Sequence, residues 1–188
     1  MPRRVGFVKL TPVRAMTAVT AIVGLDALTK AAVLKTMSEG ETIEVIAGLF
    51  SLTYLRNAGA AFGMLADLPD PWRQIFFVSI ALVTVGFLLF IYRGTPEGRL
   101  KERASIVAIV GGALGNLLDR FVYGEVIDFL DFYIADWHWP AFNLADSCIT
   151  IGVMVLVFAS VSGTDVRENP VAADRLDANG AGGQHSSG

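Results

Sequence analysis

The sequence predicts an all-α membrane protein with four transmembrane helices and a small sheet in one long loop. Two observations predict this class. The 188 residues are 53% hydrophobic and 18% charged, whereas a soluble domain is about 45–50% apolar and about 25% charged. The apolar excess is concentrated in runs that approach or reach the ~20 residues needed to cross a bilayer. These runs are roughly Ala15 to Leu34, Ile75 to Tyr92, Ala104 to Val122 and Ala141 to Val161.

The first run is interpreted as a retained helix rather than a cleaved signal peptide. It is long, it continues through Asp26 and Lys30, and it has no convincing small-residue cleavage site. Because these two residues are four apart on a helix, they can form an ion pair that lowers the cost of both charges. The alternative is that one of them orients the outer loop or a lipid head group.

Basic residues give the predicted orientation. Four precede the first run and four lie in residues 93–103. Positive residues in short loops stay on the cytoplasmic side, so both termini and this loop are expected in the cytoplasm. Loops 35–73 and 123–140 then face outward. Their aromatic residues near helix ends are typical of interfacial anchors: Trp72, Tyr133, Trp137 and Trp139.

The first outer loop is too long to be a bare connection. Its segment ETIEVIAGLFSLTYLRN is rich in β-branched and aromatic residues and predicts two short strands separated at Gly48. The next segment, NAGAAFGML, is a candidate for a short helix on the membrane surface. The proline-rich LPDPW then begins the second helix. Its apolar run IFFVSIALVTVGFLLFIY carries no charge and is interpreted as a lipid-facing or scaffold helix.

These elements predict one membrane domain, residues 1–162. Residues 163–188 lack apolar periodicity, so we expect a disordered cytoplasmic tail that is dispensable for chemistry. The net charge of −3 comes without a basic stripe, so no nucleic-acid partner is expected. Cys148, the single cysteine, is expected to be a packing residue. His138 is expected at the interfacial surface, because the other histidine, His185, lies in the tail and cannot complete a metal site.

Two aspartates carry the predicted chemistry. Asp128 follows the outer end of the third run, and Asp146 lies about one and a half turns inside the fourth, from the same side. Two close carboxyls share a proton, and their pKa values separate. One can then take a proton from water while the other protonates the carbonyl or the leaving amine. This apparatus hydrolyses a peptide bond without a nucleophilic side chain or a metal. The alternative is that either aspartate caps a helix or pairs with an arginine.

Polar residues are predicted to surround this pair. Asn143 lies three residues before Asp146 and can donate to a carboxylate or a substrate, cap the helix, or do both. Asn116, Asp119 and Arg120 share a face of the third helix. Arg120 can pair with Asp119 or present its guanidinium to a substrate.

Other features of the sequence have simpler interpretations. Asn57 and the small residues after it can present hydrogen-bond donors to an extended peptide, although the signal is weak in isolation. Asp131 and Asp136 fall in the outer loop and are expected to be solvated charges. Gly111 and Gly115 have the GxxxG spacing that lets a neighbouring helix approach closely.

Five blocks carry a resemblance to a known family. They are DALTK at 26–30, NAGAAF at 57–62, GGALGNLLDR at 111–120, VIDF at 126–129 and FNLADSCI at 142–149. In order and spacing they resemble the lipoprotein signal peptidases (signal peptidase II), which are bacterial membrane aspartyl proteases. Each block alone would be weak, but together they are specific.

The resemblance implies a four-helix enzyme of the bacterial inner membrane with an extracytoplasmic β-cradle and a surface-lying helix. It implies that Asp128 and Asp146 are catalytic and that a prolipoprotein is cleaved just before its diacylglyceryl-modified cysteine. The implied substrate-binding residues are Asp26, Lys30, Asn57, Asn116, Arg120 and Asn143. It also implies inhibition by the cyclic peptide globomycin, no cofactor and no metal. The expected partners are lipid-modified prolipoproteins and membrane lipids, and a monomer is expected.

Two other functions fit parts of the pattern. A transporter or proton relay also uses intramembrane acids, but it would need ionisable groups at several depths, whereas these acids gather at one face. A scaffold that uses the GxxxG face leaves Asp128 and Asp146 unexplained. The sequence therefore favours a hydrolase.

Overall fold

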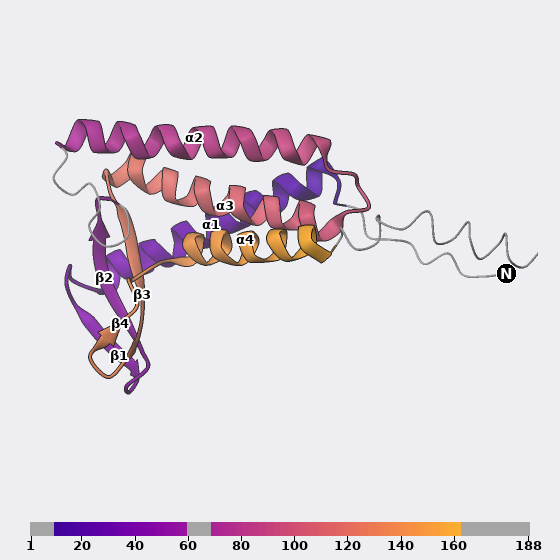
Figure 1. Cartoon of the computed structure of the whole chain (residues 1–188). Coiled ribbons are helices and arrows are strands. Elements are labelled where there is room, and N and C mark those ends of the chain that lie inside the picture. Colours follow the sequence, from indigo (N-terminus) through magenta and orange to yellow (C-terminus); the bar gives the residue numbers. More distant parts are fainter. Residues whose placement is uncertain (1–9, 60–68, 163–188) are drawn as a thin grey trace, which may run out of the picture.

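A computed structural model describes residues 10–59 and 69–162 of the chain. This part consists of four long helices and one four-stranded antiparallel sheet (Figure 1). The helices are α1 (Pro12–Thr36), α2 (Asp70–Gly94), α3 (Leu100–Tyr123) and α4 (Leu144–Ser162). The strands are β1 (Thr42–Ile46), β2 (Phe50–Asn57), β3 (Val126–Ile134) and β4 (Trp137–His138), in that order across the sheet. All four helices are long and apolar enough to cross a membrane, which confirms the predicted fold class.

The helix ends differ from the apolar runs that predicted them. Both α1 and α2 have 25 residues and are about 37 Å long at ~1.5 Å per residue, so they exceed the ~30 Å hydrocarbon core. Apolar runs mark only the part of a helix that lies in lipid, and charged helix formers continue it into the interface. In contrast, α4 begins three residues later than predicted, because Phe142 forms a β-bridge with Leu130 instead of joining the helix.

The central helix of the bundle is α3, which packs against the other three (Figure 1). Its side chains Ile106, Ile109 and Val110 form a buried core with Val85 and Leu88 of α2. By comparison, α1, α2 and α4 expose many large apolar side chains, as expected for surfaces that face lipid.

Glycine residues let α3 approach α1 and α4 closely. A Cβ atom at Gly112 would collide with the backbone carbonyl oxygen of Ala145 on α4. A Cβ atom at Gly115 would lie 2.8 Å from Oδ2 of Asp26 on α1. The predicted close contact at the GxxxG spacing is therefore present, and the tightest approach is at Gly112, between the two predicted positions.

The sheet lies at one end of the bundle and extends across the helix axes (Figure 1). The two strands predicted in the first outer loop are confirmed as β1 and β2. The segment proposed as a surface-lying helix falls mostly on residues 60–68, which lie outside the described residues. The predicted tail, residues 163–188, also lies outside them.

The second outer loop is not a plain connection, because it forms β3 and β4. Antiparallel pairing with β2 places β3 inside the sheet and buries most of its side chains. The prediction that Asp131 is a solvated charge is therefore wrong. Asp131 is only 8% exposed, and both of its carboxylate oxygens lie 3.0 Å from Nδ1 of His138. Asp136 is exposed, as predicted.

Candidate active site

Asp128 is held where the sheet meets the bundle. It is the third residue of β3, opposite Leu55 of β2, and it is 3% exposed. Asn57 ends the same neighbouring strand and donates a hydrogen bond from Nδ2 to Oδ2 of Asp128 at 2.9 Å. The strand pairing therefore fixes the carboxyl and its amide partner together.

Asp146 lies in the first turn of α4, not one and a half turns inside it as the sequence predicted. Asn143, the residue just before α4, caps the helix: its Oδ1 accepts the Asp146 backbone N–H at 2.9 Å. In return, Oδ2 of Asp146 accepts the Asn143 backbone N–H at 3.2 Å. This reciprocal pair satisfies two helix N–H groups that would otherwise lack partners. A carboxylate in this turn also meets the positive end of the helix dipole.

One residue contacts both carboxyls. Asn143 is fully buried and donates from Nδ2 to Oδ1 of Asp128 at 2.8 Å. Its backbone N–H is the donor to Asp146 described above. A strand and a helix that are separate in the sequence thus present their acids to one another through a single asparagine. The capping role and the carboxylate-binding role expected for Asn143 both occur.

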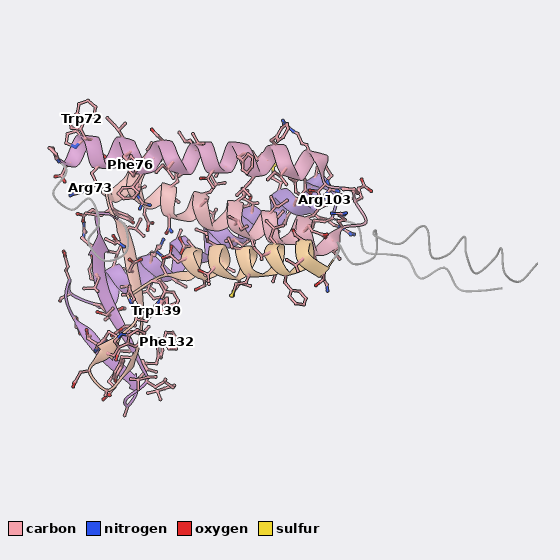
Figure 2. The ribbon with its side chains drawn as sticks, in the orientation of Figure 1. Trp72, Arg73, Phe76, Arg103, Phe132 and Trp139 are labelled. Carbon is pink, nitrogen blue, oxygen red and sulfur yellow. The ribbon has the colours of Figure 1, made fainter. Side chains whose placement is uncertain are left out.

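The two carboxyls share the wall of a cavity of about 970 Å³. The cavity lies between the sheet and the ends of α2, α3 and α4, and it is mostly apolar with a few converging polar groups, as binding sites commonly are. Its polar lining includes Asn57, Asn116 and Arg120. Its apolar lining includes Phe77, Trp139, Phe142 and Ile151. Trp139 lies where the sheet joins the bundle (Figure 2).

Two predicted binding residues are not in the cavity wall. Asp26 and Lys30 are each 1% exposed and form the predicted ion pair within α1, with Nζ 2.7 Å from Oδ2 of Asp26. The same Nζ lies 2.7 Å from Oδ2 of Asp119 on α3. Neither Asp26 nor Lys30 is among the residues that line the cavity, and their predicted role in substrate binding stays a prediction.

Arg120 does not pair with Asp119, which was one of two alternatives for it. Its guanidinium lies 5.0 Å from the centre of the Phe77 ring, and its Nη1 donates to the backbone oxygen of Asn116 at 3.3 Å. Arg120 therefore lines the cavity, and the second alternative, that its guanidinium meets a substrate, stays a prediction.

The electrostatic setting of Asp128 suits proton transfer near neutral pH. Burial raises the pKa of this carboxyl from its ordinary 3.8 to about 7. The hydrogen bond from Asn57 lowers the pKa, and the neighbouring Asp146 raises it. Asp128 can thus hold a proton at a pH where exposed aspartates have lost theirs.

Comparison with known proteins identifies the family. A family model described as Signal peptidase (SPase) II matches residues 18–162. The chain belongs to the signal peptidase II family. This signal peptidase II is accordingly an aspartic peptidase and a multi-pass membrane protein with four candidate spans, as the sequence predicted.

Curated relatives and a solved structure agree with this assignment. A lipoprotein signal peptidase of Geobacter sulfurreducens is 48% identical over 132 residues, which cover 70% of this chain and 81% of that protein. A lipoprotein signal peptidase of Azoarcus sp. is 44% identical over 159 residues, covering 85% and 88%. A solved structure described as a bacterial membrane enzyme determined by the in meso method at 2.3 Å resolution has a TM-score of 0.75 and 32% identity. The match covers 87% of this chain and 97% of the chain in the solved structure.

The cavity of this signal peptidase II also contains residues that the sequence did not single out. Phe77 belongs to the uncharged apolar run of α2, which was interpreted as a lipid-facing or scaffold helix, yet it lines the cavity and contacts Arg120. Trp139 was expected only as an interfacial anchor, yet it lines the cavity. Aromatic residues near membrane helix ends are common, so no local signal marked Phe77. The position of Trp139 just before the FNLAD block was the one available hint.

Proposed function

We propose that this signal peptidase II removes the signal peptide from lipid-modified prolipoproteins by cleaving just before the lipidated cysteine, with Asp128 and Asp146 as its catalytic acids. One observation carries the proposal: Asn143 bonds to both carboxyls on the wall of one cavity. The substrate class is supported by relatives named lipoprotein signal peptidase at 44% and 48% identity.

The proposed reaction needs only water and the two acids. Ionised Asp146 takes a proton from a water molecule, whose oxygen attacks the scissile carbonyl carbon. Protonated Asp128, whose pKa of about 7 allows it to hold this proton, donates it to the carbonyl oxygen. The resulting tetrahedral diol collapses as the C–N bond breaks and the amine nitrogen takes up the proton held by Asp146. Asp128 recovers a proton from one hydroxyl of the diol, so the products are the carboxylic acid of the signal peptide, which then ionises in water, and the free amine of the lipidated cysteine.

The remaining cavity residues have proposed binding roles. Asn57 and Asn116 each donate to one catalytic carboxyl, and Arg120 offers donors to substrate carbonyl groups. The apolar lining residues Phe77 and Ile151 lie on α2 and α4, whose outer faces expose apolar side chains. Acyl chains of the substrate can therefore lie between these helices while the peptide reaches the acids.

We also propose that the sheet end of the bundle faces outward and that both termini are cytoplasmic. The basic loop between α2 and α3 lies at the opposite end, where Figure 2 labels Arg103, and positive loops stay inside. Because one chain supplies both carboxyls and the cavity wall around them, the proposed reaction needs no second copy, and we propose a monomeric enzyme.

Lipidation is expected to decide whether a peptide is cleaved. The test uses purified full-length enzyme with two synthetic peptides of one sequence, with and without diacylglyceryl on the cysteine. Mass spectrometry should show a product that begins at the lipidated cysteine and little cleavage of the unmodified peptide. Equal cleavage of the two peptides, or cleavage at another bond, would contradict the proposed substrate class.

The rate is expected to fall as pH rises through about 7, because Asp128 then loses the proton it donates. Replacing Asn57 with leucine removes a hydrogen bond that lowers the pKa of Asp128. The pKa of Asp128 in the folded enzyme should rise, so Asp128 should keep its proton to higher pH. The alkaline limb of the pH–rate curve should then shift to higher pH. The measurement is kcat across the pH range at saturating lipopeptide. A downward shift in Asn57→Leu would show that Asp128 does not govern this limb.

A further inference from the structure

The backbone residue just before each catalytic acid is anchored to a buried carboxylate. Ile127 immediately precedes the acid of β3, and its N–H donates to Oδ2 of Asp119 at 3.1 Å. Ala145 immediately precedes the acid of α4, and its N–H donates to Oδ1 of Asp26 at 3.0 Å. Both anchored residues are fully buried. Each catalytic acid is thus one residue away from an anchor.

Lys30 joins these two anchors. Its Nζ lies 2.7 Å from Oδ2 of Asp26 and 2.7 Å from Oδ2 of Asp119. It also donates to Oδ1 of Asn116 at 3.1 Å. An ammonium group has three N–H donors, so these three contacts use all of them. The contacts run from α1 to α3 and, through the two carboxylates, to α4 and β3.

The third contact orients an amide that touches the catalytic pair. Oδ1 of Asn116 accepts hydrogen bonds from Lys30 and, at 3.1 Å, from Nδ2 of Asn143. Because an ammonium can only donate, the oxygen of this amide must face Lys30. Its Nδ2 is then directed to Oδ1 of Asp146, which it meets at 2.7 Å. Loss of the ammonium would remove one of the two donors that hold this oxygen in place and leave Asn143 as the other.

We propose that Lys30 is a positioning residue that fixes the separation and hydrogen bonding of the two catalytic acids without contacting the substrate. The inference rests on the proposed function of the acid pair. It differs from the implication of the family resemblance that Asp26 and Lys30 bind substrate, because both are 1% exposed and lie outside the cavity wall.

The first test is Lys30→Met in the full-length membrane protein. Methionine keeps most of the side-chain volume and removes the charge and all three donors. We expect kcat for a diacylglyceryl lipopeptide to fall about 100-fold, the loss typical of a catalytic group misplaced by ~1 Å. KM should stay within about threefold, because the substrate is not contacted. The matched control is Lys35→Met, an exposed lysine on the same helix, which should keep the activity of the unmodified enzyme.

A second variant separates positioning from charge balance. Removing one partner of a buried ion pair leaves an uncompensated charge and can prevent folding. The triple variant Asp26→Asn/Lys30→Met/Asp119→Asn leaves no such charge, and its asparagine oxygens can still accept the Ala145 and Ile127 N–H groups. We expect it to insert and fold but to keep kcat at least about 10-fold below that of the unmodified enzyme, since Asn116 has lost one of the two donors that orient its oxygen.

The pH profile is a readout that a purely structural role would not move. The charge of Lys30 lowers the pKa of Asp128, so in Lys30→Met the limb governed by Asp128 should shift to higher pH. An unshifted profile, a raised KM with unchanged kcat, or a folded triple variant as active as the unmodified enzyme would each overturn the proposal. Failure of both variants to accumulate in membranes would also overturn it, in favour of a folding role.

The same assay distinguishes this inference from the function on which it rests. Asp128→Asn and Asp146→Asn are measured beside the lysine variants. If both aspartate variants cleave normally, the proposed catalytic pair is wrong. If they are inactive while Lys30→Met cleaves at the rate of the unmodified enzyme, the catalytic pair stands and only the positioning role fails.

Discussion

Asp128→Asn and Asp146→Asn are each expected to lower kcat by about 100- to 10,000-fold, the range for loss of a general acid or base. Asparagine has nearly the shape of aspartate, so the cavity should persist and KM should change little. It cannot exchange the proton that the mechanism moves between water, carbonyl and amine. The measurement is the cleavage rate of a diacylglyceryl lipopeptide by purified variants that have the elution profile and melting temperature of the unmodified enzyme. The double variant should have a kcat no lower than that of the less active single variant, because the two acids act as one unit.

Asp131→Asn is the matched control for this experiment. Asp131 is also a buried aspartate of β3, but it pairs with His138 and is not part of the cavity wall. The variant should therefore keep most of its activity. If it loses as much activity as Asp128→Asn, the loss reflects damage to the strand. If both catalytic-pair variants cleave at the rate of the unmodified enzyme, the two carboxyls are not the acids of the reaction.

The sequence was enough to predict that Asp128 and Asp146 approach each other, and the reason is physical. An acid at the margin of an apolar helix is costly, so each position stood out against its surroundings. Both were placed near the same bilayer surface, where two helices begin or end. The strand that carries Asp128 was missed because the acids in VIDFLDFYI interrupt its apolar pattern and suggest a wet loop. Its pairing with β2 supplies the burial that the pattern alone did not indicate.

The partners of Lys30 could be predicted only in part. Asp26 is four residues away on the same helix, and helical spacing alone predicts that contact. The contacts with Asn116 and Asp119 join α1 to α3, and they depend on how the two helices are packed and rotated. No local spacing encodes that rotation. The binding role of Lys30 was implied by the family resemblance alone, and the structure buries this lysine outside the cavity wall.

Gly112→Ala is expected to disrupt the enzyme although it changes neither charge nor polarity. The new methyl group would collide with the backbone carbonyl of Ala145 and lie 2.8 Å from Cγ1 of Ile149. A side chain can rotate away from such a collision, but a helix backbone cannot, so α3 and α4 must separate. Overpacking of this kind costs about 1–3 kcal/mol or more. We expect a lower melting temperature in detergent and a clear loss of kcat.

The loss of activity in Gly112→Ala should exceed what its fall in stability explains, and Gly86→Ala is the matched control. Gly86 lies on α2, where a Cβ atom would have no neighbour within 4 Å among the described residues, so alanine there should leave stability unchanged or raise it slightly. At Gly112 the displaced residue, Ala145, is the one before Asp146 and donates the N–H that Asp26 accepts. Moving it shifts Asp146, a proposed catalytic acid, directly. If Gly112→Ala melts at a lower temperature but its folded fraction keeps full kcat, the close approach of α3 and α4 contributes to stability alone, and the acids are positioned by other contacts.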